Sequence, residues 1–101
     1  MILLFDIGNT HTHLGLANDK RVVKQLNIPT SGWFNGQAQK LVSQFIGRAK
    51  IEGAALCSVV PRATPAVHSF CRKKWKINCL ELTAKTVSGV GIDYPKPETI
   101  G

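Results

Sequence analysis

The spacing of apolar residues changes twice along the chain, and the first part has the pattern of strands. Met1–Phe5 is an unbroken apolar run of strand length, which predicts a central strand covered on both faces. Residues 12–17 and 21–28 are two further predicted strands, the second with Val22, Leu26 and Ile28 on one face. Because only short turns separate these three runs, we expect a three-stranded antiparallel meander.

The next part of the chain is a predicted loop followed by a predicted helix. Pro29–Gly36 is predicted to be a loop, because Pro, Ser, Gly and Asn interrupt it. From Ala38 to Ala49, apolar residues then recur at the spacing of a helix with one apolar stripe. Residues 54–60 are a second buried strand, which Pro61 ends.

The last recognisable elements are a helix and a short strand. Thr64 and Pro65 form an N-cap and first-turn pair for a helix that runs to Trp75, and residues 77–82 are again a strand. The predicted order is β-β-β-α-β-α-β, with the later strands parallel to the first, and this is an α/β layered domain.

Length and composition indicate one compact domain in a reducing compartment. A chain of 101 residues with 44% apolar content can bury one ordinary core, and its apolar runs are too short to span a bilayer. Asp6 interrupts the segment where a signal peptide would be apolar, so we expect a cytoplasmic protein. Cys57, Cys71 and Cys79 lack a metal-ligand spacing and are best read as free thiols.

The net charge of +7 points to an anionic partner. Four cations surround Trp75: Arg72, Lys73, Lys74 and Lys76. Such a cluster can follow a phosphate backbone, but cations also favour the last turn of a helix, where they offset its dipole, and we prefer that reading.

The turn after the first strand carries most of the candidate chemistry. Gly8, free to take positive φ, together with Asn9, Thr10 and Thr12, supplies the small residues and convergent N–H groups that a phosphate-binding turn needs. Asp6, at the end of a buried strand, can orient water on a phosphate-bound Mg²⁺. A simple hairpin turn explains the same five residues, Asp6–Thr10, about equally well.

His11 and His13 would share one strand face and could ligate a metal, although half-exposed strand residues are the simpler interpretation.

Three sequence blocks favour a phosphate-binding turn over a simple hairpin turn. D-I-G-N-T-x-T at 6–12 with L-G-L at 14–16, S-V-V-P at 58–61, and G-x-x-Y-x-x-P-x-x-[VI]-G at 91–101 resemble the N-terminal half of type III pantothenate kinase. That family includes the Bvg accessory factor and belongs to the actin, sugar-kinase and Hsp70-like ATPase superfamily. The resemblance implies a ribonuclease H-like (actin-like ATPase) lobe.

The resemblance also implies an activity and a site. The activity is ATP-dependent phosphorylation of pantothenate to 4'-phosphopantothenate, the first step of coenzyme A biosynthesis, by a homodimer. The implied ATP-phosphate loop consists of Asp6, Ile7, Gly8, Asn9, Thr10, His11, Thr12 and His13, with Asp6 placing Mg²⁺. Tyr94 would line the pantothenate pocket, and Gly101 would open the family's G-x-D-R motif.

The rest of the implied machinery would follow Gly101. This includes the catalytic aspartate, the carboxylate that holds a monovalent cation (K⁺ or NH₄⁺), and the C-terminal lobe. We therefore expect residues 1–101 to be an N-terminal nucleotide-binding lobe, apparently truncated, that has little or no activity alone. Segments 30–35 and 94–97 depart from the family's usual pattern, which affects substrate contacts more than the nucleotide loop.

The alternative is a protein without this activity. It would be an inactive member of the family or a basic regulatory module that binds nucleic acid, and its support is the charge of +7 with the cluster at 72–76. The sequence contains no recognised nucleic-acid-binding motif, so a nucleic-acid partner is the less favoured reading.

Overall fold

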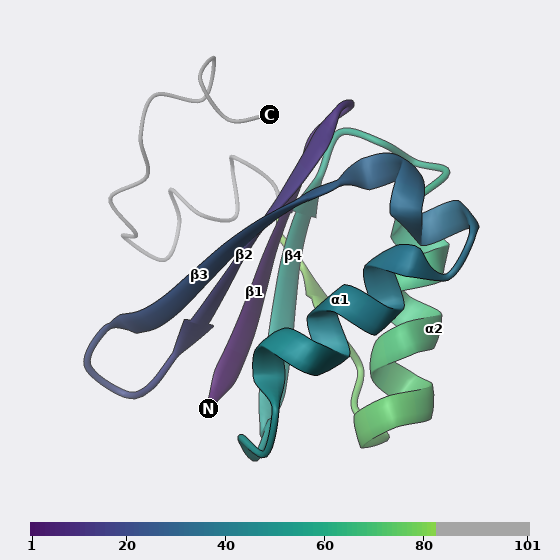
Figure 1. The fold of residues 1–101 in the computed structure, drawn as a ribbon. Helices are drawn as coiled ribbons and strands as arrows, with labels where there is room; N and C mark the ends of the chain where they lie inside the picture. The colour runs from purple at the N-terminus through teal and green to yellow at the C-terminus, as the bar shows by residue number, and fades with distance from the viewer. Residues whose placement is uncertain (83–101) are drawn as a thin grey trace.

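The computed structural model describes residues 1–82, which form a five-stranded mixed sheet with two helices (Figure 1). The strands lie in the order β3-β2-β1-β4-β5. β1 is antiparallel to β2 and parallel to β4, and β4 is parallel to β5. The elements in chain order are β1 (Ile2–Ile7), β2 (His11–Ala17), β3 (Val22–Pro29), the 3₁₀ helix η1 (Thr30–Phe34), α1 (Gln37–Ile46), β4 (Gly53–Ser58), α2 (Thr64–Trp75) and β5 (Leu80–Glu81). The predicted α/β class and order of strands and helices are confirmed.

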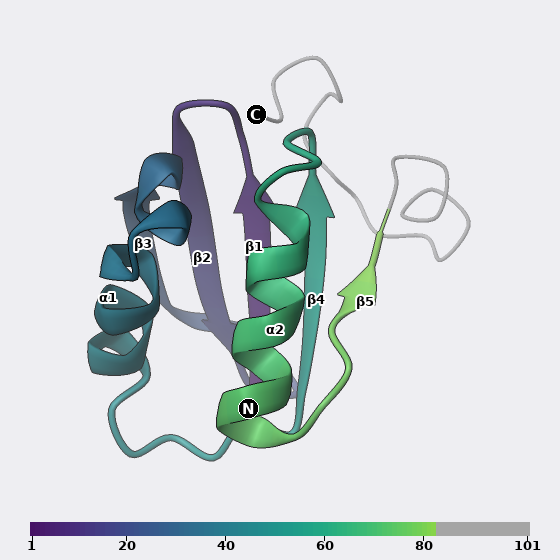
Figure 2. The ribbon, with the colours of Figure 1, turned by 90° about the vertical axis from the view of Figure 1, so that its right-hand side faces the viewer.

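Both helices cover the same face of the sheet, which Figure 2 shows from the helical side. Leu3, Phe5 and Ile7 of β1 point into this layer and are buried. Ile2 and Leu4 point to the other face and are 38% and 36% exposed. The prediction that the first strand is covered on both faces is therefore wrong for the described residues, because no helix among them lies on that second face.

A bulge changes the face on which β3 begins. Leu26 pairs with Leu14, and Ile28 pairs with Thr12, so both lie on the helical face, as predicted. The register shifts at Leu16/Ala17, where Val22 pairs with Ala17, and Val22 is 42% exposed. The extra residue of a bulge reverses the alternation of side chains. The prediction that Val22 shares the face of Leu26 and Ile28 is therefore wrong.

The helix α1 has the predicted stripe and is bounded by two glycines. Ala38, Val42 and Ile46 are buried against the sheet. Gly36 and Gly47 flank the helix with φ of 86° and 59°, values that favour glycine over residues with a side chain. The helix therefore ends earlier than Ala49, at the residue before Gly47.

The predicted cap of α2 is wrong. Ala63 occupies the N-cap position, and Thr64 is the first helical residue, whose Oγ1 donates to the Val60 carbonyl at 3.3 Å. Pro65 lies in the first turn as expected. The helix ends with Arg72, Lys73 and Lys74 in its last turn, so the predicted position of these cations at a helix end is confirmed.

The remaining differences concern element boundaries. β1 continues through Asp6 to Ile7, β4 covers Gly53–Ser58 in place of 54–60, and β5 covers only Leu80–Glu81. The segment predicted to be a loop contains η1, and Pro29 is the last residue of β3. In the part of the chain that the structure describes, neither helix has the length and apolar character to cross a membrane.

Candidate phosphate-binding site

The candidate site lies at the carboxyl end of β1, where the chain turns back into β2. The β1–β2 turn and the β4–α2 connection lie at this same end of the sheet (Figure 2). Ile7 is paired with Ser58 of β4, and the Val59 amide donates to the Ile7 carbonyl at 3.0 Å. The second sequence block, 58–61, is therefore beside the first.

The turn itself presents a short exposed backbone. The Gly8 amide donates to the His11 carbonyl at 2.9 Å and closes the turn, while Asn9 and Thr10 are exposed. Within residues 1–82, neither the Asn9 nor the Thr10 amide donates a backbone hydrogen bond. Two N–H groups and two small polar side chains are thus available to an anion.

Gly8 does not have the backbone conformation that we expected. Positive φ occurs among the described residues at Gly36, Gly47 and Lys76, and Gly8 has none. The expectation of positive φ at Gly8 is wrong. Gly8 is buried, and its carbonyl accepts a hydrogen bond from η1, so the turn is held by contacts from outside it.

Those contacts form one buried chain of hydrogen bonds. The Trp33 indole N–H donates to Thr12 Oγ1 at 3.1 Å, the Thr12 and Thr30 hydroxyls are 2.9 Å apart, and Thr30 Oγ1 donates to the Gly8 carbonyl at 2.7 Å. Each hydroxyl carries one proton, and that of Thr30 goes to Gly8, so Thr12 must donate to Thr30. The Thr30 amide also donates to the Thr10 carbonyl at 2.9 Å. Both ends of the turn are therefore bonded to η1.

This network changes what Thr12 can do. Thr12 is fully buried, and its hydroxyl already donates to Thr30 and accepts from Trp33. Its side chain therefore supports the turn from the interior of the protein. Thr10 is exposed at the turn. Thr10, rather than Thr12, has the free hydroxyl at the surface of the candidate site.

Asp6 lies on the open face of the sheet, next to the turn. Its neighbours across the sheet are His13 of β2 and Cys57 of β4. Burial raises the pKa of the Asp6 carboxyl, and the positive charge of His13 opposes part of that rise. The Asp6 charge and burial also raise the pKa of the Cys57 thiol, with burial the larger cause.

The other predicted loop residues divide between core and surface. Ile7 is fully buried, and its side chain belongs to the hydrophobic core. His11 and His13 are exposed on the open face, where His13 Nε2 is 2.8 Å from Gln25 Oε1. Tyr94 and Gly101, and the third sequence block, lie outside the described residues.

The donor set fits one kind of metal ion. Residues 1–82 contain no group of three or more His, Cys, Asp or Glu side chains that could hold a metal. One partly buried carboxylate beside an exposed turn suits Mg²⁺, which keeps several waters and binds through one or two carboxylates together with substrate phosphates. Asp6 is the residue that would contact such an ion or its waters.

The β4–α2 connection forms a second rigid turn beside the first. Ser58 Oγ accepts from the Val60 amide at 3.0 Å and lies 3.2 Å from the Val60 carbonyl. A hollow of about 610 Å³ adjoins it, lined by Ser58, Pro61, Thr64, Pro65, His68 and Glu81. His68 Nε2 and Glu81 Oε1 are 2.6 Å apart there. The turn is thus fixed at the edge of an open hollow.

Sequence reasoning missed Thr30 and Trp33. Both lie in the segment that we predicted to be a loop, and both are buried. The sequence did offer one indication, a tryptophan and a threonine within a segment otherwise rich in Pro, Ser, Gly and Asn. Large aromatic residues are seldom left in an exposed loop.

The chain is similar to known proteins over nearly its whole length. The family model described as type III pantothenate kinase matches residues 2–101. The type III pantothenate kinase of Desulfosudis oleivorans is 28% identical over 114 aligned positions, which cover 100% of this chain and 42% of that protein. The enzyme of Pelagibacter ubique is 34% identical, over 81% of this chain and 34% of its own length. The chain therefore spans less than half the length of these relatives.

A solved structure shares the fold. The crystal structure of the Aquifex aeolicus member of the Ppx/GppA protein family superposes with a TM-score of 0.50 and 13% sequence identity. The match covers 82% of this chain and 35% of that one. At this identity the likeness concerns the fold alone.

Proposed function

Since this chain belongs to the type III pantothenate kinase family, we propose that it forms the nucleotide-binding lobe of an enzyme that phosphorylates pantothenate with ATP. The product would be 4'-phosphopantothenate, made in the first step of coenzyme A biosynthesis. The observation that carries the proposal is the Gly8–Thr10 turn, whose Asn9 and Thr10 are exposed and which is held by η1 beside Asp6.

In this proposal each part of the site has a separate task. The free amides of Asn9 and Thr10 and the Thr10 hydroxyl bind the phosphates of ATP. Asp6 holds Mg²⁺, which would neutralise phosphate charge during transfer. Gly8, Ile7 and Thr12 hold the turn in place, and His11 and His13 flank it.

The acceptor side belongs to residues beyond those described. Tyr94 and Gly101 are proposed to contact pantothenate, and a C-terminal lobe after residue 101 to supply the catalytic aspartate and the carboxylate for K⁺ or NH₄⁺. Phosphoryl transfer needs charge stabilisation from both sides of the transferred group, so this chain alone should turn over little or not at all. A homodimer and a cytoplasmic location complete the proposal, and the three free cysteines support the latter.

The test uses the intact parent protein. Pantothenate-dependent formation of ADP is measured for the wild type, for Asp6→Asn and for Asp19→Asn, which removes an exposed carboxylate from the β2–β3 turn. We expect Asp6→Asn to lower kcat by about a hundredfold or more, and Asp19→Asn to leave it unchanged. Undiminished activity in Asp6→Asn would remove Asp6 from the site, and an inactive wild type would favour the reading as an inactive family member.

A further inference from the structure

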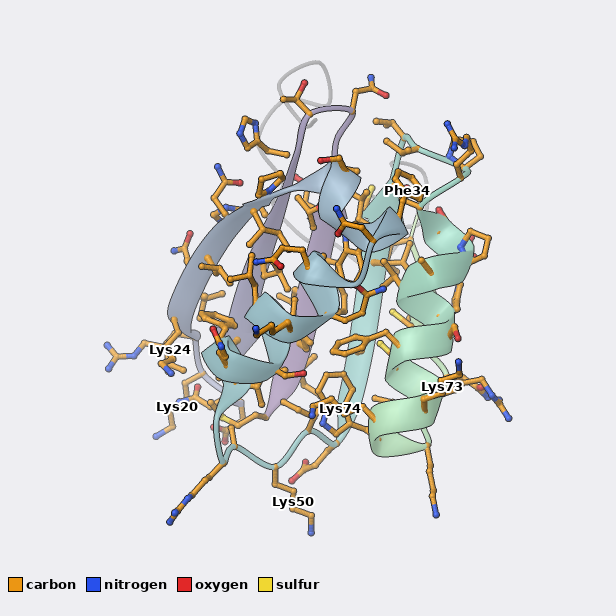
Figure 3. All side chains as sticks on the ribbon, turned by 45° about the vertical axis from the view of Figure 1, so that its right-hand side comes forward. Lys20, Lys24, Phe34, Lys50, Lys73 and Lys74 are labelled. Carbon is orange, nitrogen blue, oxygen red and sulfur yellow. The ribbon has the colours of Figure 1, made fainter. Side chains whose placement is uncertain are left out.

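The positive charge of the described residues is gathered at the end of the molecule away from the candidate site. Three parts of the chain lie toward that end, on different sides of it: the β2–β3 turn with the start of β3, the connection after α1, and the end of α2 (Figure 1). They carry nine of the chain's thirteen Lys and Arg residues, namely Lys20, Arg21, Lys24, Arg48, Lys50, Arg72, Lys73, Lys74 and Lys76. Figure 3 shows five of these lysines at one end and Phe34 near the other.

A groove between α1 and α2 lies on this helical face. Its volume is about 510 Å³, and it is lined by Gln39, Ser43, Ala66, Ser69, Phe70, Lys73 and Lys74. Lys73 and Lys74 come from the last turn of α2, so the groove carries two cations near the basic end. Ala66 and Phe70 add apolar surface to its lining.

One wall residue has an unmet hydrogen-bonding need. Gln39 Nε2 donates to the Trp33 carbonyl at 3.2 Å, which fixes the orientation of the amide, because the reverse orientation would place two oxygens together. Among residues 1–82, Gln39 Oε1 is the buried side-chain oxygen left without a partner. Because this oxygen is buried, a ligand in the groove would reach it only after the Gln39 side chain turned outward, so the two lysines and the apolar residues set what the groove offers a ligand.

We propose that this groove binds an acidic peptide segment with apolar side chains, supplied by a partner protein. Its carboxylates would pair with Lys73 and Lys74, and its apolar side chains would lie on Ala66 and Phe70. The surrounding positive field would speed its approach.

The aromatic arrangement argues against nucleic acid as the occupant. The Phe70 ring has Trp33 at 6.0 Å and Trp75 at 5.2 Å between centroids, both in edge geometry. Proteins that bind single-stranded nucleic acid stack successive bases on several exposed aromatic rings, and Phe70 is the one aromatic residue in the lining of this groove. The same contacts make the two tryptophans natural reporters of binding in the groove.

The test uses the 101-residue chain and a fluorescent octapeptide of alternating Glu and Leu residues. The double variant Lys73→Gln/Lys74→Gln is compared with Lys20→Gln/Lys50→Gln, which removes the same charge from the same end of the molecule but outside the groove. We expect the first to raise Kd about tenfold and the second to change it less than about threefold. Replacing Leu by Gly in the peptide should also weaken binding.

Thermal unfolding verifies that both double variants remain folded. Equal loss of affinity in the two variants would show that binding depends on the total charge of this end of the molecule, and would contradict binding in the groove. Absence of peptide binding, or a short DNA duplex that binds with the same dependence on Lys73 and Lys74 and displaces the peptide, would overturn the choice of occupant. The assay contains no nucleotide, so its outcome is independent of the proposed kinase function.

Discussion

The hydroxyl of Thr30 donates a 2.7 Å hydrogen bond to the carbonyl of Gly8, 22 residues earlier in the chain. This bond ends a directed chain that begins at the Trp33 indole and passes through Thr12. A chain of buried hydrogen bonds polarises its members and holds them in one arrangement. The turn that we propose for phosphates is therefore positioned by a 3₁₀ helix outside the turn.

The variant Thr30→Val tests this support. Valine keeps the shape but removes the donor to Gly8 and leaves Thr12 without an acceptor, so we expect a loss of about 1–3 kcal/mol of unfolding free energy. Urea denaturation measures it. Ser43→Ala, which removes a partly buried hydroxyl bonded to its own helix, is the control and should cost less than about 1 kcal/mol. Equal losses in both variants would mean that the network adds nothing special.

Thr10 and Thr12 should separate binding from stability. Thr10→Val changes an exposed side chain, so we expect weaker ATP binding with unfolding free energy within about 0.5 kcal/mol of wild type. Thr12→Val breaks two buried hydrogen bonds and should cost about 1–3 kcal/mol. Calorimetric titration and denaturation measure the two quantities. If Thr10→Val bound ATP normally, its hydroxyl would have no role in the site.

A methyl group at Gly32 should disturb η1 directly. A Cβ there would lie 2.9 Å from the Ala38 backbone nitrogen and 3.2 Å from its Cβ, so η1 would have to shift away from α1. We expect Gly32→Ala to cost about 1–3 kcal/mol. It should also weaken ATP binding, because Thr30 and Trp33 move with η1. Ser31→Ala, at an exposed neighbouring position, is the control, and an equally stable Gly32→Ala would contradict the close packing.

Asp6 should lower stability at neutral pH. Its folded-state pKa is raised above the ordinary 3.8, so the folded protein binds the proton more tightly than the unfolded chain. The ionised carboxylate therefore costs stability above the folded pKa, and this cost disappears as pH falls below 3.8. Asp6→Asn should be more stable than wild type at pH 7, with the difference shrinking towards pH 3. Denaturation at several pH values measures the difference in unfolding free energy between the variant and the wild type. A difference that grows on acidification would contradict the raised pKa of Asp6.

The sequence was sufficient for the elements whose signals are local. The stripe of Ala38, Val42 and Ile46 predicted α1, and the spacing of apolar runs predicted the order of strands and helices. The alternation of Leu3 and Phe5 with Ile2 and Leu4 was hidden, because all four are apolar. Which face the helices cover is decided by the whole fold.

The support of the site could not be predicted for a similar reason. Thr30 is 18 residues from Thr12 and 22 from Gly8, and their contact depends on the pairing of β2 with β3. The bulge at Leu16/Ala17 likewise arises in the pairing of two strands. Local patterns located the turn, while the tertiary structure determined what holds it.

Nuclear magnetic resonance of the isotope-labelled chain, titrated with Mg²⁺–ATP, tests the central claim most directly. We predict that the amide signals of residues 8–12 and 58–60 shift, and that AMP, which lacks the β- and γ-phosphates, shifts them much less. Weak affinity does not prevent this measurement. Unchanged signals at residues 8–12, or shifts confined to the basic residues 72–76, would contradict the account.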